Sequence, residues 1–349
     1  AAAAAVTSAV APAQAQDAAR IREAEQVLAR LVETYGVSGM EGPVREAVRR
    51  LLPGWARAET DSAGNLWLTV GKGEPTVVFV AHLDEVGFSV TGVDDDGTLE
   101  LAPVGGIFPS LWGGMPALVH TGDSAVPGVF QPRDTAAALR VDVGATTRAA
   151  AEALGLRAGQ TVTMPKDYAR LAGFRATGRS FDDRVGSAAQ VLAVRRLDPA
   201  RLRHTVVFLW SVREEIGLEG ARAAANALGL RAARVHAIDT FVSADSPLER
   251  PAFALAPLGE GPVARALDNS SVTPPAYLDS LVALARAHRI PLQVGTTNGG
   301  NDGSAFAAYG VPDVPIGWPL RYSHSPAEVA DLRDVSHLAE LVLAVAREW

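Results

Sequence analysis

The sequence Thr205-Val-Val-Phe-Leu-Trp-Ser-Val-Arg-Glu-Glu-Ile-Gly-Leu-Glu-Gly220 combines a strand pattern with two adjacent carboxylates. Its apolar run from Val206 to Trp210 shows no helical period, which is typical of a strand buried on both faces. Glu214 and Glu215 follow this run, and open α/β sheets place ligands and catalytic groups just beyond the carboxyl ends of their strands. Adjacent glutamates are also common on protein surfaces, so this stretch alone favours a solvated acidic turn.

Other parts of the chain repeat this pairing of an apolar run with a histidine or a carboxylate. Imidazole and carboxylate side chains without any cysteine are the ligand set of a zinc or cobalt site rather than of a thiolate structural site. Because chance does not readily produce several such segments in one chain, they predict a metal site. The segments are the runs Thr76–Ala81, Val235–Ile238 and Val314–Trp318, which precede His82 and Asp84, Asp239, and His324, and the loop Ser180–Gly186, which carries Asp182 and Asp183.

The composition limits the classes of function. The chain has 349 residues, of which 48% are hydrophobic, so it can bury a large core in one or two domains. Beyond the amino terminus, no run of about 18 apolar residues predicts a membrane span. The net charge of −7 and the lack of a basic stripe argue against nucleic-acid binding. The absence of cysteine excludes disulfides, thiolate metal sites and a cysteine nucleophile.

Residues 1–16 are predicted to be the remnant of a leader rather than part of the fold. The small apolar stretch Ala1–Val10 is followed by an Ala-x-Ala pattern at Ala13–Ala15, which is typical of the end of a secretory signal. This predicts a periplasmic or secreted protein whose mature chain begins near Gln16. A cytoplasmic protein with an alanine-rich leader is the alternative, and the intact mass of protein from the native host would distinguish the two.

The rest of the chain predicts an α/β domain formed by residues 17–92 and 174–349. Apolar residues at helical spacing predict two helices within Asp17–Leu52, and a turn signal at Ala63-Gly64 predicts a hairpin over Ala58–Val70. After Phe174, helix and strand patterns alternate, which favours an α/β sheet. Later helices are predicted over Val185–Leu197, Glu219–Leu228, Tyr277–His288 and Ser304–Tyr309.

Residues 93–173 differ in character and predict an inserted β unit. Glycine pairs and short β-prone runs favour a small barrel-like domain, interrupted by one helix over Thr147–Leu154. The insertion falls between the candidate ligands His82 and Asp182. Near its start, the insertion has more large apolar residues than a solvated appendage needs. They are Ile107, Phe108, Leu111 and Trp112.

The chain resembles the tetrahedral dinuclear metalloaminopeptidases, because six of its motifs occur in the order seen in that family. The family includes glutamyl, leucyl and deblocking aminopeptidases, and some of its members are labelled cellulases. The resemblance runs from about Ile21 to the end of the chain and includes the insertion, which a generic dinuclear peptidase lacks at this point. The motifs are His82-Leu-Asp-Glu-Val-Gly87, Phe181-Asp-Asp-Arg-Val-Gly186, Glu214-Glu-Ile-Gly-Leu-Glu-Gly220, Asp239, Gly299-Gly-Asn-Asp302 and Pro319-Leu-Arg-Tyr-Ser-His-Ser-Pro326.

The resemblance implies a zinc-exopeptidase-like α/β/α sandwich that holds two divalent cations, either Zn²⁺ or Co²⁺, with Mn²⁺ as a further candidate. Two such cations would acidify a bridging water, and a carboxylate that is not a ligand would take its proton. The implied roles are His82 and Asp239 on one cation, Glu215 and His324 on the other, Asp182 bridging both, Asp84 as the hydrogen-bond partner of His82, and Glu214 as the general base.

Other polar residues receive lesser roles. The loop Gly299–Gly303 lacks the lysine of a phosphate-binding loop, so it is not assigned to phosphate. The family usually has threonine before Asp302, whereas this chain has Asn301, which leaves the substrate contacts of this loop open. Asp183 is predicted to be structural. Five histidines are predicted to be packed or exposed rather than ligands, namely His120, His204, His236, His288 and His337.

The predicted function is removal of amino-terminal residues from peptides. A carboxypeptidase- or aminoacylase-like amidohydrolase of the same clan is the alternative, and a non-catalytic peptide- or metal-binding relative is another. An intact Glu214 favours an enzyme over a binding protein. A glycosidase could use two carboxylates but would give the paired histidines no role. The resemblance also implies that the insertion pairs subunits and that dimers then build a hollow dodecamer.

Overall fold

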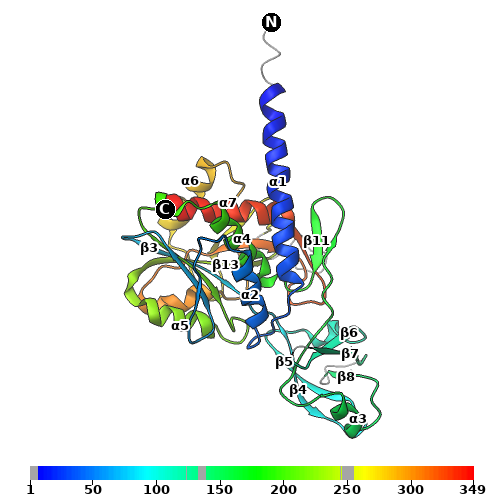
Figure 1. Ribbon diagram of the computed structural model, residues 1–349. Helices are drawn as coiled ribbons and strands as arrows, with labels where there is room; N and C mark the ends of the chain where they lie inside the picture. The colour runs from blue at the N-terminus through cyan, green and yellow to red at the C-terminus, as the bar shows by residue number, and fades with distance from the viewer. Residues whose placement is uncertain (1–6, 123, 133–138, 244, 246–254) are drawn as a thin grey trace.

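The structure is a computed structural model, and it describes residues 7–122, 124–132, 139–243, 245 and 255–349. Its larger part is an eight-stranded sheet with helices on both faces, and a smaller closed β-barrel lies at one end (Figure 1). The predicted fold class, an α/β/α sandwich with an inserted barrel, is therefore confirmed.

The centre of the large sheet is parallel. The strands β12, β3, β13 and β16 pair in this order and run in one direction, so their carboxyl ends meet at one edge. Antiparallel pairing adds β2 beside β12 and β14 beside β16. In order across the sheet, the strands are β1 (Glu59–Thr60), β2 (Leu66–Val70), β12 (Thr205–Ser211), β3 (Thr76–His82), β13 (Ala232–Val242), β16 (Ile316–Leu320), β14 (Val263–Leu267) and β15 (Gln293–Thr296).

The two faces of the sheet form separate hydrophobic clusters. Along β3, Val77 and Phe79 pack into one cluster, while Val78 and Val80 pack into the other, because successive side chains of a strand point to opposite faces. This explains why the strand sequences are continuously apolar. The first face is covered by α1 (Thr7–Val32), α2 (Gly42–Leu51), α4 (Phe181–Arg196), α6 (Pro275–Ala287) and α7 (Leu332–Glu348), and the second by α5 (Glu219–Leu228) and the 3-10 helix η4 (Asp302–Tyr309).

The barrel has a core of its own. The rings of Phe88, Trp112 and Phe130 lie 5.1 to 5.5 Å apart at its centre. Trp112 is fully buried there, so it is not one of the surplus surface residues that the sequence predicted. In order around the barrel, the strands are β4 (Gly87–Val93), β5 (Leu99–Val104), β8 (Arg140–Asp142), β7 (Ala125–Phe130), β6 (Pro116–His120) and β9 (Thr161–Thr163), and the helix α3 (Arg148–Ala153) packs beside them.

Buried charges and a small sheet join the barrel to the sandwich. Lys166, which follows the last barrel strand, places its Nζ 2.7 Å from an Oε of Glu85, and both side chains are buried. Arg179 also donates to Glu85 over 2.8 Å. The third sheet pairs β10 (Ala169–Arg170), β11 (Arg175–Gly178) and β17 (Glu328–Asp331), which sets Gly178 opposite Glu328.

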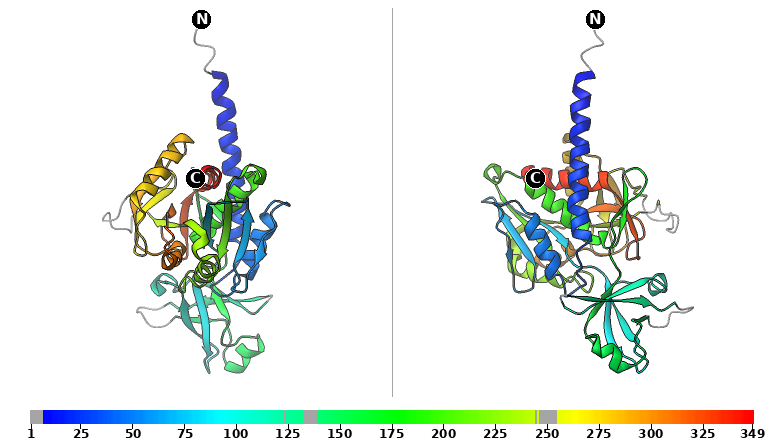
Figure 2. Two further views of the ribbon diagram at one scale, coloured as in Figure 1. Left: turned by 90° about the vertical axis from the view of Figure 1, so that its left-hand side faces the viewer. Right: turned by 45° about the vertical axis from the view of Figure 1, so that its right-hand side comes forward.

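The amino terminus was predicted to be a leader outside the fold. Residues 1–6 lie outside the described part of the chain, and residues 7–16 form the start of α1, which begins at Thr7 and continues through Gln16 without a break. Alanine has the highest helix propensity of all residues, and the apolar face of α1, which includes Val27 and Leu28, anchors the helix further along. The first half of α1 projects away from the barrel (Figures 1 and 2).

Three boundaries differ from those predicted. The strand β4 is already part of the barrel, although the insertion was predicted to cover residues 93–173. The helix α4 begins at Phe181 with non-helical backbone at Asp182 and Asp183, four residues before the predicted Val185. The predicted helix Ser304–Tyr309 is a 3-10 helix, which the Asn301 side chain caps by accepting from the N–H of Gly303 over 2.7 Å. None of the described helices combines the length and hydropathy needed to cross a membrane.

Candidate metal centre

All five predicted ligands meet at the carboxyl edge of the sheet, on the side of the barrel. Potential ligand atoms within 4.8 Å of one another define two groups that share Asp182. A third group contains His82, Glu214 and Glu215. Within the described residues, none of the five other histidines joins such a group. The two groups that share Asp182 are His82, Asp182 and Asp239, and Asp182, Glu215 and His324.

His82 ends β3 and is fixed by bonds at both ring nitrogens. Its Nδ1 lies 3.1 Å from the main-chain carbonyl of Asp84, and its Nε2 lies 3.1 Å from Oδ1 of Asp182. Because a carbonyl can only accept, Nδ1 carries the proton and Nε2 is the atom left to bind a metal. Burial would lower the pKa of His82, but the carboxylates of Asp182 and Asp84 outweigh it and raise that pKa well above its usual value.

Asp84 holds the two glutamates as well as His82. Its carboxylate lies 3.5 Å from Nδ1 of His82, and it accepts from the main-chain N–H groups of Glu214 and Glu215 over 3.0 and 3.2 Å. Ser38 donates a further hydrogen bond to it over 2.6 Å. Asp84 therefore links the end of β3 to the turn that follows β12, a role that the sequence did not predict.

Asp182 lies at the start of α4 and faces both imidazoles. Its Oδ1 contacts His82, and its Oδ2 lies 3.3 Å from Nε2 of His324. Thr240 and Ser323 donate to Oδ2 over 3.3 and 3.2 Å. Burial would raise the pKa of Asp182, but the two histidines lower it. The carboxylate is thus placed to serve two neighbouring cations, one with each oxygen.

The neighbouring Asp183 points away from the pocket. Its Oδ1 accepts from the N–H of Gly186 and from the indole N–H of Trp318, each over 2.9 Å. A Cβ at position 186 would lie 2.3 Å from Oδ2 of Asp183, which explains the glycine there. These contacts give Asp183 the structural role that was predicted.

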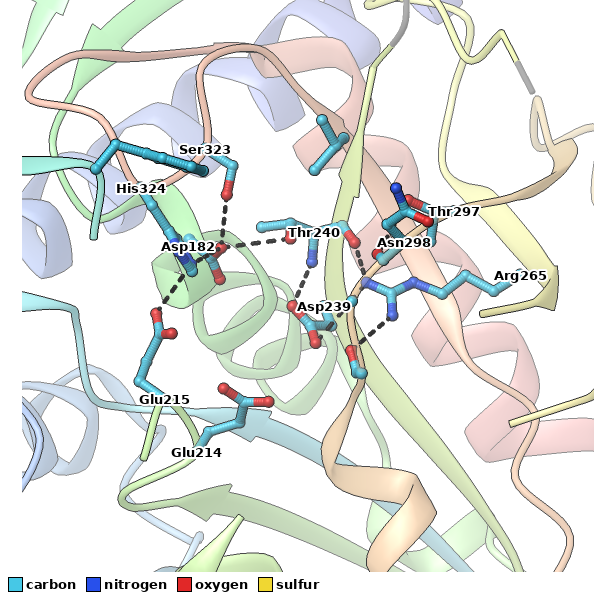
Figure 3. Close-up of a pocket in the computed structure, with 14 residues that line it drawn as sticks. Asp182, Glu214, Glu215, Asp239, Thr240, Arg265, Thr297, Asn298, Ser323 and His324 are labelled. Atoms are coloured by element: carbon cyan, nitrogen blue, oxygen red, sulfur yellow. Dashed lines mark hydrogen bonds and ion pairs between the residues drawn. The ribbon is translucent and has the colours of Figure 1, made fainter. Parts of the chain in front are cut away.

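Glu215 and Glu214 enter the pocket from the turn after β12, as Figure 3 shows. Oε1 of Glu215 lies 3.4 Å from Nε2 of His324 and, although buried, accepts no hydrogen bond. A buried carboxylate oxygen without a partner is costly, and a cation would satisfy it. Burial also raises the pKa of the Glu214 carboxyl well above its usual value.

Asp239 lies inside β13 rather than at its end, since the strand continues to Val242. Its Oδ1 accepts from the N–H of Thr240 over 2.6 Å, and burial raises its pKa to about 6. Arg265 approaches Oδ2 of Asp239 at 3.7 Å and donates to the carbonyls of Thr240 and Gly300. Arg265 thereby joins β13 to the loop after β15, and no motif pointed to it.

Glu328 is a second residue that the sequence did not identify. One carboxylate oxygen accepts from the N–H of Phe181 over 2.7 Å, and the other accepts from the N–H of His324 over 3.0 Å. The side chain is buried, and burial raises its pKa to about 7. Glu328 therefore connects the main chain beside Asp182 with the main chain of His324.

The ligand set fits divalent cations. Asp182, Glu214, Glu215 and Asp239 bring four carboxylates into one pocket of about 370 Å³, where positive charge would remove their mutual repulsion. Imidazole and carboxylate groups suit zinc, cobalt and manganese. The pocket is also lined by Phe108 from the barrel, by Val242, and by residues 297–300. Asn301 is not a wall residue, since its amide donates to Asp268 over 2.7 Å.

A parallel-centred α/β/α sandwich with buried imidazole and carboxylate ligands beyond its strand ends has the architecture of a metallopeptidase. The sequence model of one peptidase family, described as M42 glutamyl aminopeptidase, matches residues 64–341. The chain belongs to this family, whose members are metal-dependent aminopeptidases.

Several proteins are similar over nearly the whole chain. A lysyl aminopeptidase of Pyrococcus furiosus is 30% identical over 343 residues, which cover 93% of this chain and 96% of the relative. A TET1 peptidase of Pyrococcus horikoshii, described as assembling into a tetrahedron or a large octahedral shell, is 31% identical with a TM-score of 0.84, covering 95% of this chain and all of that one. A Thermotoga maritima structure described as an endoglucanase is 28% identical with a TM-score of 0.77, covering 92% and 96%.

Proposed function

We propose that this M42 peptidase removes amino-terminal residues from peptides by means of two divalent cations and Glu214 as the general base. The proposal is carried by one observation: two ligand groups share Asp182, while Glu214 lines the same pocket and belongs to neither of them. His82 and Asp239 would hold one cation, and Glu215 and His324 the other.

The side chains then divide the chemistry. When bound, the cations lower the pKa of a shared water and polarise the scissile carbonyl. Glu214 takes a proton from the attacking water and passes it to the leaving amine. Asp84 accepts from the main-chain N–H groups of both glutamates and so fixes the turn that carries them. The two side chains are thereby held at separate positions in the pocket.

Metal analysis combined with a panel of aminoacyl anilides tests this function. We expect two divalent ions per chain, hydrolysis of free aminoacyl anilides, and no hydrolysis of their N-acetylated forms. Chelation should abolish the activity, and Zn²⁺, Co²⁺ or Mn²⁺ should restore it. Release of residues from the carboxyl end of peptides would instead favour a carboxypeptidase-like enzyme. Bound metal without hydrolysis of any substrate would indicate a binding protein.

We do not extend the endoglucanase description of the Thermotoga maritima relative to this chain. Glycoside hydrolysis needs a pair of carboxyl groups, one on each side of the scissile bond, and gives imidazole no part. Here the carboxylates of Asp182 and Glu215 instead face the imidazoles of His82 and His324, with oxygens 3.1 to 3.4 Å from an Nε2. This convergence supports a metal site.

We also propose that the protein assembles through its barrel into dimers or multiples of dimers, up to a tetrahedral dodecamer. Large apolar side chains remain exposed on the barrel even though its core is filled: Phe108 is 60% exposed, and Leu111 and Val129 are each 47% exposed. Exposed apolar residues of this size are typical of contact surfaces. The shells described for the Pyrococcus horikoshii peptidase are consistent with such contacts.

The exchange Val129→Asp is expected to lower the assembled mass, because burying an unpaired carboxylate at a contact is strongly unfavourable. Multi-angle light scattering at micromolar concentration measures this mass. The control is Leu154→Asp, which places the same charge at a comparably exposed residue at the end of α3. A monomeric wild-type protein would contradict the proposed assembly, and an equal effect of both variants would contradict the proposed surface.

For the location in the cell, we propose export to the periplasm or the exterior. The support is the leader-like composition of residues 1–16 and the exposure of residues 14–16 on the projecting part of α1, where a processing enzyme has access.

A further inference from the structure

Both candidate histidine ligands bond through Nδ1 to a main-chain carbonyl, but the two carbonyls have different origins. For His82 the carbonyl is that of Asp84, two residues further along the same strand end. For His324 it is that of Gly106, at 2.6 Å, from a segment 218 residues away in the chain. The first partner is thus supplied locally, whereas the second is supplied by the inserted barrel.

The segment that supplies the second carbonyl is residues 105–111, which we call the barrel arm. It follows β5 and ends in a short 3-10 helix, Pro109–Leu111. A Cβ at Gly105 would lie 2.7 Å from a methyl group of Val86 and 3.3 Å from Cβ of Glu215, and a Cβ at Gly106 would lie 3.2 Å from Nδ1 of His324. The two glycines therefore let the arm pack directly against both ligands of one proposed cation.

His324 needs this outside support. Its φ of 60° is in the left-handed region, and the loop is held there through its N–H by Glu328. That bond fixes the main chain but leaves the ring free to turn. The side chain is also a quarter exposed, so water competes for Nδ1. A fixed carbonyl acceptor keeps the proton on Nδ1 and turns Nε2 toward Asp182 and Glu215.

We infer that Gly106 is a positioning residue of the metal centre: its carbonyl selects the tautomer and the orientation of His324, so that the barrel arm completes the cation site formed by His324 and Glu215. The inference rests on the proposed two-cation site. It assigns the barrel a part in the chemistry that is separate from any part in assembly.

The variant Gly106→Ala tests the inference. The φ of Gly106 lies outside the left-handed region, so alanine fits the backbone, and its methyl group must displace the His324 ring by a few tenths of an ångström. Because the displaced ring is no longer aligned with the carbonyl of residue 106, we expect the affinity of one of the two zinc sites to fall roughly 10- to 100-fold, the range for a metal ligand that loses its orienting hydrogen bond. The other site, at His82, should keep its affinity. Zinc titration against a competing chelator measures both affinities without reference to activity.

The matched control is Gly92→Ala, in the barrel strand β4. Its added methyl group would meet only the flexible carboxylate end of Glu100, at 3.4 Å. Thermal unfolding of the metal-free proteins shows whether either variant is misfolded, and we expect both to match the wild type. In the cobalt-loaded Gly106→Ala protein, the visible spectrum should lose the contribution of one of the two sites.

Each result separates this inference from the proposed function. Wild-type zinc affinity at both sites in Gly106→Ala would overturn the role of the carbonyl and leave the proposed function intact. An equal loss at both sites, or a loss matched by Gly92→Ala, would overturn it as well, because the effect would then be general. A wild-type protein that binds only one ion would contradict the two-cation site, and the inference would fall with it.

Discussion

Glu214→Gln is expected to bind both metal ions normally while losing catalysis by roughly 10²-fold or more, the scale for loss of acid–base assistance. The amide has nearly the size of the carboxylate and leaves the N–H of residue 214 bonded to Asp84. Only proton transfer is removed. The measurements are kcat/KM on an aminoacyl anilide and the metal content of the same preparation.

The same exchange at the neighbouring position should behave differently. Glu215→Gln removes an anionic ligand beside His324, so metal should bind more weakly at one site, and excess metal in the assay should restore part of the activity. The control is Glu219→Gln, an exposed residue that pairs with Arg213 at the surface and should have wild-type activity. Exchanged phenotypes of the first two variants would mean that base and ligand are assigned the wrong way round. Full activity in both would remove the pair from the active site.

Asp182→Asn is expected to weaken metal binding at both sites, because its two oxygens face the two histidines. Removing one partner from a buried charged pair costs about 3–5 kcal/mol, which corresponds to a loss of affinity of roughly 10²- to 10³-fold or more. No other single exchange in the pocket should affect both ions to this extent. Competition with a chelator, followed by metal analysis, measures the two affinities.

Asp183→Asn is the matched control for this variant. Oδ1 of Asp183 accepts both of its hydrogen bonds, and the oxygen of an asparagine amide can accept the same two. Both metal ions should therefore remain bound. If Asp182→Asn lost only one ion, the two sites would not share this carboxylate, and the assignment of a bridging ligand would be wrong.

The sequence was most informative where a side chain follows a strand that is buried on both faces. The continuous apolar runs before His82 and before the two glutamates predicted β3 and β12, and the parallel pairing of these strands brings their ends together. Asp239 was harder to place, because its strand continues past the last apolar residue of the predicted run. The resemblance to a peptidase family, rather than the local pattern, divided the five ligands into two groups.

Long-range contacts account for what the sequence could not show. Glu328 accepts from the main chain of Phe181 because β17 pairs with β11, and no local sequence pattern predicts a hydrogen bond between residues 147 positions apart. Gly106 acts through its carbonyl, which every residue possesses, so its side chain carries no signal. The sequence around Arg265 contains no motif, and only the fold shows that this side chain is buried beside Asp239. The alanine-rich composition of residues 1–16 predicted a leader but not that residues 7–16 continue α1 as a helix.

The join between barrel and sandwich limits how this protein can be shortened. The insertion looks like a module that could be cut out, since the strands from β4 to β9 form a barrel with a core of its own and β11 leads back to the sandwich. Excision would nevertheless leave the buried Glu85 without Lys166 and His324 without the carbonyl of Gly106. Simple deletion of the insertion would therefore also remove part of the proposed metal centre, so a minimal catalytic domain needs replacements for both contacts.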